Sequence, residues 1–274
     1  MDKAAILGIY NFVSFQVCQT LLNKGIEVNG IHIDTKTEQF LDEKRLEIGR
    51  NANFTENSFS EWKDSKQKES NKEKMILSIY DLFMLGEESI LHDERVLNPV
   101  LQYLDQYKDE ANIIIIAPIQ ALAESIPSID RFLEKTRGGE DTIQFIYLPA
   151  IFGPWQPQVF MFQQAIVSSI QKGEVSLSDR EWTEDALFAE DAAETIVEII
   201  DEGKPGRYLL ESGRKGYWQQ CAAYLDEGLL KGMNRESIQI NSPVTRVHVK
   251  NITPIAKAFS IQKEYVKLHC ITKR

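Results

Sequence analysis

The side chains with the clearest chemical meaning near the start of the chain are Gly8, Asn11 and Ser14, spaced three residues apart after a short apolar run. Loops that bind a pyrophosphate through the backbone carry glycine at three such positions. Glycine allows the tight turn, the approach of the phosphate and close helix packing. Asn11 tolerates a positive φ better than most residues, but we expect its side chain to fill the phosphate's path. Tyr10 adds a bulky ring, so the spacing predicts a damaged phosphate loop.

The elements that position this loop follow from alternating apolar and amphipathic segments. Unbroken apolar runs predict buried strands at 4–8, 27–33, 74–80, 112–117 and 142–148, and amphipathic stretches predict helices at 12–24, 94–107, 128–137, 158–171 and 189–201. Strands that are apolar on both faces are typical of parallel sheets. Strand–helix alternation predicts right-handed crossovers. We therefore expect an α/β fold, a Rossmann-like doubly wound, mostly parallel sheet with a small mixed C-terminal lobe.

The charge distribution divides the chain. Its 274 residues carry a net charge of -10. Residues 204–274 hold 13 basic and 5 acidic side chains, whereas residues 1–203 hold 18 basic and 36 acidic ones. With the turn chemistry of Gly203–Gly206, this predicts a domain at 1–204 and a small basic lobe at 205–274. The lobe either attracts the acidic body or an oligomer partner, or meets a small anionic ligand.

Other features exclude several function classes. The net negative charge disfavours nucleic-acid binding, because phosphate neutralisation needs cations. No run of about 18 apolar residues is present, so we expect no membrane segment. The three cysteines, Cys18, Cys221 and Cys270, form no metal-binding pair, and their odd number favours a reducing cytoplasm. The four histidines are scattered, so we expect no metal site.

Three segments together resemble one family. These are residues 8–14 (GIYNFVS), residues 148–157 (LPAIFGPWQP) and residues 188–194 (FAEDAAE). In this order and at about this spacing they are similar to segments of the extended short-chain dehydrogenases/reductases, the NAD-dependent epimerase/dehydratase group. The resemblance implies a Rossmann-like fold and a dinucleotide at the first loop. The residues that would hold it, vestigially or weakly, are Gly8, Asn11, Phe12, Val13, Ser14 and Asp34.

The ribose position is open between two interpretations. In the resemblance, the acidic residue expected at the end of the second strand falls on His32, and Asp34 follows two residues later. Asp34 either binds the ribose hydroxyls instead or is an ordinary polar strand end.

The catalytic groups implied by the family have no match in this chain. The family uses a Tyr-x-x-x-Lys pair as acid/base, together with a hydroxyl after a central strand. No Tyr here is followed by Lys four residues later, and Ala117 and Pro118 stand at the hydroxyl position. We therefore assign no catalytic residue. Tyr10 and Trp155 are candidates for ligand contact, each against simple packing.

Three functional hypotheses remain open from the sequence. The first is a degenerate epimerase/dehydratase-like protein without oxidoreductase activity, a pseudoenzyme acting as a binding or scaffold protein with no NAD(P) or only weak NAD(P) binding. The second is an atypical NAD(P)-dependent oxidoreductase or sugar-nucleotide epimerase with relocated catalytic groups. The third is an NAD(P)-sensing regulator. A protein partner or a homo-oligomer is compatible with each.

Overall fold

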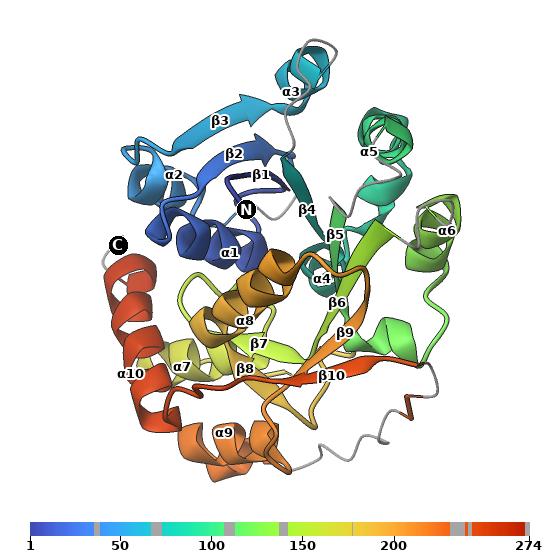
Figure 1. Ribbon diagram of the computed structural model, residues 1–274. Helices are drawn as coiled ribbons and strands as arrows, with labels where there is room; N and C mark the ends of the chain where they lie inside the picture. Colours follow the sequence, from blue (N-terminus) through green and yellow to red (C-terminus); the bar gives the residue numbers. More distant parts are fainter. Residues whose placement is uncertain are drawn as a thin grey trace.

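The computed structural model describes residues 1–35, 39–66, 73–106, 113–136, 142–176, 178–230, 239–240 and 243–271. Its centre is an eight-stranded sheet in the order β10-β9-β6-β5-β4-β1-β2-β3, in which every neighbouring pair is parallel (Figure 1). The strands are β1 (Lys3–Leu7), β2 (Glu27–His32), β3 (Phe54–Ser58), β4 (Lys74–Ser78), β5 (Ile113–Pro118), β6 (Ile143–Leu148), β9 (Gly206–Glu211) and β10 (Thr245–His248).

The central strands are built from apolar residues that are buried on both faces. Every residue of β5 and β6 is buried, and β1 and β4 are buried after their first residue. The predicted doubly wound sheet is therefore confirmed. The strand order reverses between β1 and β4, whose residues Leu7 and Leu77 pair. Open α/β sheets bind ligands beyond the carboxyl ends of the strands at such a reversal.

Helices cover both faces of the sheet. Figure 1 shows α1 and α8 packed together on one side and α5 and α6 on the other. The helices are α1 (Phe12–Asn23), α2 (Leu41–Ile48), α3 (Phe59–Lys66), α4 (Ile79–Leu85), α5 (Glu94–Gln106), α6 (Pro127–Thr136), α7 (Met161–Gln171), α8 (Ala189–Glu202), α9 (Tyr217–Leu225) and α10 (Ile255–Val266). Among the described residues, no helix is long and apolar enough to cross a lipid bilayer.

A second apolar cluster lies beside the main core. It gathers residues of α7, α9, α10 and a two-stranded parallel sheet formed by β7 (Ala150–Phe152) and β8 (Ala186–Phe188). Phe152 and Phe259 stack at its centre, with ring centroids 4.8 Å apart. The strands that follow Gly203, β9 and β10, extend the main sheet. The predicted boundary at residue 204 stays a prediction.

Several elements differ from the sequence-based expectation. The run at 74–80 splits, because Ser78 ends the strand and its Oγ accepts a hydrogen bond from the Asp81 N–H to start α4. Between residues 33 and 74 the sequence predicted no element, whereas the structure has α2, β3 and α3, the last with the buried Trp62.

Candidate functional site: the start of helix α1

The loop between β1 and α1 makes its turn at Gly8 alone. Gly8 has a φ of 69°, whereas Asn11 is extended, with φ -66° and ψ 159°. Gly8 therefore supplies the left-handed turn, and the tolerance of asparagine for a positive φ is not used at Asn11. A Cβ on Gly8 would lie 2.6 Å from Nδ2 of Asn11. The Asn11 amide thus covers the glycine at which a ligand's phosphate would need to approach the backbone.

The first turn of α1 is capped by a carboxylate from another helix. Oδ1 of Asp81, on α4, accepts a hydrogen bond of 3.0 Å from the Val13 N–H, and Oδ2 accepts bonds of 3.2 Å from the N–H groups of Val13 and Ser14. Asp81 is 1% exposed and Ser14 is fully buried. Free N–H groups and the positive dipole end make a helix start an anion site. In this chain that anion is the chain's own carboxylate.

Hydrogen-bond donors and a buried lysine surround the Asp81 carboxylate. Burial raises the pKa of the Asp81 carboxyl, while the N–H groups of α1, the Ser78 hydroxyl and the charge of Lys44 favour its ionised form. Lys44, on α2, is 3% exposed and donates a 2.5 Å hydrogen bond to the carbonyl oxygen of Tyr10. A buried lysine bonded to the loop thus supplies positive charge near the buried aspartate.

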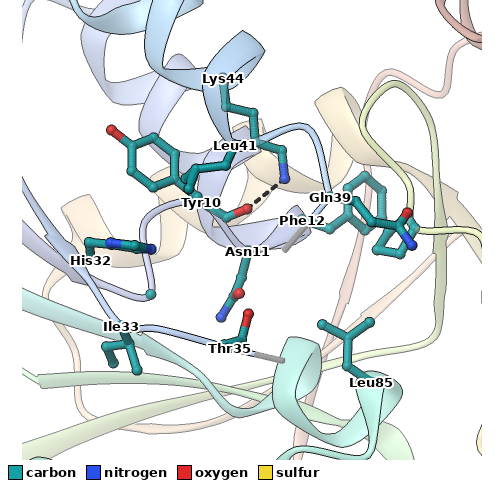
Figure 2. A pocket seen from close by; sticks show the side chains of 12 residues that line it. Tyr10, Asn11, Phe12, His32, Ile33, Thr35, Gln39, Leu41, Lys44 and Leu85 are labelled. Carbon is teal, nitrogen blue, oxygen red and sulfur yellow. Dashed lines mark hydrogen bonds between the residues drawn. The ribbon is translucent and has the colours of Figure 1, made fainter. Parts of the chain in front are cut away.

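Little space remains at this loop. Figure 2 shows Tyr10, Asn11 and Lys44 around it, with the Lys44–Tyr10 bond dashed. The cavity that these side chains line has a volume of about 20 Å³. That is roughly the space for one water molecule, while small-molecule sites usually measure about 300–1,000 Å³. Among the described residues, the structure thus shows only a small space beside this loop.

Tyr10 is held by packing and by a hydrogen bond. Its hydroxyl donates to Oε2 of Glu56 at 2.6 Å, and the Arg45 guanidinium lies over its ring, 5.3 Å from the centroid. The ring also meets His32 edge to face at 5.6 Å. Burial and the Glu56 carboxylate raise the pKa of the Tyr10 hydroxyl well above its ordinary value. In this arrangement Tyr10 is a poor proton donor.

The end of β2 borders a more open space. Nδ1 of His32 lies 3.7 Å from Oδ1 of Asp34, whose side chain is almost fully exposed. Both residues line a pocket of about 490 Å³, together with Ser58, Phe59 and Arg95. The structure therefore brings Asp34 to an open pocket, next to the nearly filled loop that holds Gly8 and Asn11.

The segment that contains Arg180 and Glu181, called the strap below, is bonded to the chain just beyond β4 and β5. The Arg180 guanidinium donates to the Phe83 carbonyl oxygen at 2.5 Å and forms an ion pair with Glu88. The Arg180 carbonyl oxygen accepts a 2.6 Å hydrogen bond from Nε2 of Gln120, just after β5. The neighbouring carboxylate of Glu181 accepts the Met161 N–H at the start of α7. The strap thus ties the two apolar clusters together over the edge where open α/β sheets bind ligands.

The positions implied for proton transfer hold apolar or structural residues. Ala117 and Pro118 end β5 and are buried in register with Tyr147 and Leu148. Ser125, the next hydroxyl along the chain, donates to Oδ2 of Asp130 at 2.6 Å at the start of α6. The sequence of α6 is PSIDRFLEKT, without a tyrosine.

Trp155 lies within an aromatic cluster. Its ring meets Phe15, Phe40 and Tyr265 at centroid distances of 5.3, 6.1 and 4.5 Å, and it is 5% exposed. Trp155 has a φ of 69°, a strained value for a tryptophan. Trp155 nevertheless lines a pocket of about 440 Å³ together with Tyr265 and His269, so its role as a ligand contact stays a prediction.

Comparison with solved structures gives the same architecture. A dTDP-glucose 4,6-dehydratase from Bacillus anthracis in complex with NAD superposes with a TM-score of 0.66 at 10% identity, over 98% of this chain and 97% of that one. A UDP-glucuronic acid 4-epimerase from Bacillus cereus in complex with NAD gives 0.65 at 13% identity, over 97% and 99%. The fold resembles that of NAD-dependent epimerases and dehydratases. A DesIV dTDP-glucose 4,6-dehydratase from Streptomyces venezuelae, with NAD and TYD bound, gives 0.65 at 10% identity, over 97% of each chain. No protein-family model and no curated protein sequence matches the chain.

Asp81 and Lys44 are the site residues that sequence reasoning missed. Asp81 does carry a signal, because it is the one charged residue in the apolar segment from Met75 to Leu85 and follows Ser78 at capping-box spacing. That pattern predicts a cap for its own helix, and it gives no indication that the carboxylate also reaches α1. Lys44 lies in a polar helix of mixed charge, where nothing marks it as buried.

Proposed function

We propose that this chain is a binding or scaffold protein on an epimerase/dehydratase-like fold, in which Asp81 takes the place of a dinucleotide phosphate and no hydride transfer occurs. The observation that carries the proposal is the pair of N–H groups at the start of α1, both bonded to Asp81. The neighbouring solved structures contain NAD. In this chain the hydrogen bonds from Val13 and Ser14 to Asp81 support the proposal that no phosphate binds at the start of α1.

Electrostatics oppose a second anion at the same helix start. Two unit charges 4 Å apart repel by about 4 kcal/mol at an effective dielectric constant of 20. Asp81 is buried and bonded to two backbone donors, so it cannot turn away without leaving those donors unpaired. An unpaired buried donor costs about 1–3 kcal/mol. A dinucleotide phosphate therefore meets either the repulsion, if Asp81 stays, or the cost of displacing Asp81 from its two donors, if it moves.

A second candidate function is an NAD(P)-sensing regulator or an atypical oxidoreductase. The observation that favours it is the pocket of about 490 Å³ at His32 and Asp34, which lies open beside the filled loop. A nucleoside could bind there without using the start of α1. An oxidoreductase reaction at that pocket would also need a side chain that acts as acid/base. Tyr10 is poorly suited to that role, because it is buried and hydrogen-bonded.

A turnover screen tests the proposal against the enzymatic candidate. UDP-, GDP- and dTDP-sugars are incubated with each of the four nicotinamide cofactors, and both absorbance at 340 nm and epimer formation are followed. We expect no product above background. A positioned acid/base contributes roughly 10²- to 10⁴-fold to such reactions. Reproducible turnover would overturn the proposal, and its loss in Tyr10→Phe would identify Tyr10 as the relocated group.

A further inference from the structure

A second loop at the carboxyl edge of the sheet has the chemistry of an anion site. β9 ends at Glu211 and continues as Ser212-Gly213-Arg214-Lys215-Gly216 into α9. Gly213 and Gly216 have φ values of 68° and 61°, so the loop turns twice through the left-handed region. This places Arg214 and Lys215 side by side between a strand end and a helix start. Gly216, at the cap position of α9, has no side chain to accept the N–H groups of the first turn.

The loop borders a cavity of useful size. Its volume is about 520 Å³, and it is lined by Trp182, Glu184, Arg214, Lys215 and Gln219 among others. The volume falls within the usual range for small-molecule sites, about 300–1,000 Å³. At the start of α1, by contrast, the cavity measures about 20 Å³. The chain therefore has room for a small molecule beyond β9.

The cations at this cavity are available to a ligand. Arg214 and Lys215 are exposed, and neither forms an ion pair within the part of the chain that the structure describes. The Arg214 guanidinium lies over the Tyr217 ring, 5.0 Å from its centroid, which holds it near the start of α9. Arginine offers paired donors that match phosphate oxygens, and lysine adds a point charge.

The acidic side chains of the cavity are mostly engaged elsewhere. The Asp185 carboxylate accepts the N–H and hydroxyl of Ser212, and Glu211 is paired with Arg246. Glu184 has no partner among the described residues, and burial raises the pKa of its carboxyl. The Ser212 donors are neutral and leave the charge of Asp185 in place, so Glu184 and Asp185 are the carboxylates that oppose an anion here.

A buried donor without a partner lies in a residue beside the cavity. Trp182 lines the cavity, and its buried indole N–H has no acceptor among the described residues. Buried polar groups are almost always hydrogen-bonded, so each exception calls for an explanation. We propose that the cavity between the 212–216 loop and Trp182 binds a phosphate-bearing small molecule, with Arg214 and Lys215 holding the phosphate.

This inference goes beyond the proposed function and does not depend on it. The site lies at β9 and α9, on the far side of β6, β5 and β4 from the Gly8 loop. A protein that did bind NAD at α1 would still present Arg214 and Lys215 to a phosphate. The two ideas therefore fail separately: NADH binding that Arg214→Ala/Lys215→Ala leaves unchanged would overturn the first alone.

Titration calorimetry with inorganic phosphate and pyrophosphate tests the site. We expect saturable binding of at least one probe with a Kd below about 1 mM, roughly 4 kcal/mol. Arg214→Ala/Lys215→Ala should weaken that binding at least tenfold. Arg131→Ala/Lys135→Ala on α6 removes the same charge from another exposed surface and should change it less than twofold. Glu184→Gln should tighten binding, because it removes an opposing carboxylate without removing a donor.

The opposite results would overturn the inference. Absence of saturable binding in the wild-type chain would do so, as would equal affinity in the Arg214/Lys215 and Arg131/Lys135 variants. Melting curves of each variant show whether the fold is retained. Trp182→Phe gives a second test if the double variant fails to fold. This variant should raise the Kd for pyrophosphate severalfold, and an unchanged Kd would count against the site.

Discussion

Asp81 on α4 bonds across to the start of α1, where its Oδ1 accepts the Val13 N–H at 3.0 Å. The two residues are 68 positions apart in the sequence. They meet because β1 and β4 are parallel neighbours in the sheet. Helix α1 follows β1 and helix α4 follows β4, so both helices begin at the same edge. This contact ties the two halves of the doubly wound sheet together at the point where its strand order reverses. It also neutralises the helix end that a phosphate would use.

Removing the carboxylate should destabilise the protein in a way that a small carboxylate reverses. Asp81→Ala leaves the buried N–H groups of Val13 and Ser14 without an acceptor, so we expect urea unfolding to show a loss of about 1–3 kcal/mol. Formate can enter the space left by the side chain and restore part of that stability by binding the native state. Asp34→Ala removes an exposed carboxylate and is the matched control. Equal stability of Asp81→Ala and the wild type would refute the capping role.

Restoring glycine to the loop should not by itself restore nucleotide binding. Asn11→Gly/Ser14→Gly clears the side chain over Gly8 but leaves Asp81 on the helix start. We therefore expect NADH affinity to rise only when Asp81→Ala is added to the pair. Calorimetry on the double and triple variants checks this. If the double variant binds as tightly as the triple one, the side chains were the obstacle and the carboxylate was not.

Glu56 should contribute to the acid sensitivity of stability. Burial acts to raise its pKa, but hydrogen bonds from Arg45 and Tyr10 outweigh burial, so the pKa lies below the ordinary value of 4.5. A carboxyl with a lowered folded pKa stabilises the protein above its unfolded pKa, and this stability is lost as pH falls through the folded pKa. Because the pair is partly exposed, we expect about 0.2–1 kcal/mol.

Urea unfolding between pH 7 and pH 3 measures this contribution. The difference in stability between the wild type and Glu56→Gln should be present at pH 7 and disappear below pH 4.5. Glu134→Gln, on the exposed face of α6, is the control. A difference that stays constant with pH would show that Glu56 acts through packing and not through its charge.

The sequence was informative wherever local pattern determines structure. The apolar run of β5 and the strand–loop–helix at Gly8 predicted their own conformations, because burial on both faces and a glycine turn are local requirements. The caps were not predictable in this way. Asp81 reads as a local cap after Ser78, and its second role depends on which strand lies beside β1. Likewise, Trp155 follows a strand end as a ligand platform would, but its burial comes from Tyr265, more than a hundred residues away.

The central claim is that the start of α1 is closed to a dinucleotide, and direct titration of the unmodified chain with NADH tests it. Isothermal titration calorimetry should give no Kd tighter than about 0.1 mM, roughly 5.5 kcal/mol, and the same holds for NAD, NADP and NADPH. A micromolar Kd for any of the four, with a stoichiometry near one, would contradict the account. If Arg214→Ala/Lys215→Ala leaves such a Kd unchanged and Asp81→Ala tightens it, the nucleotide binds at the start of α1 in place of the Asp81 carboxylate.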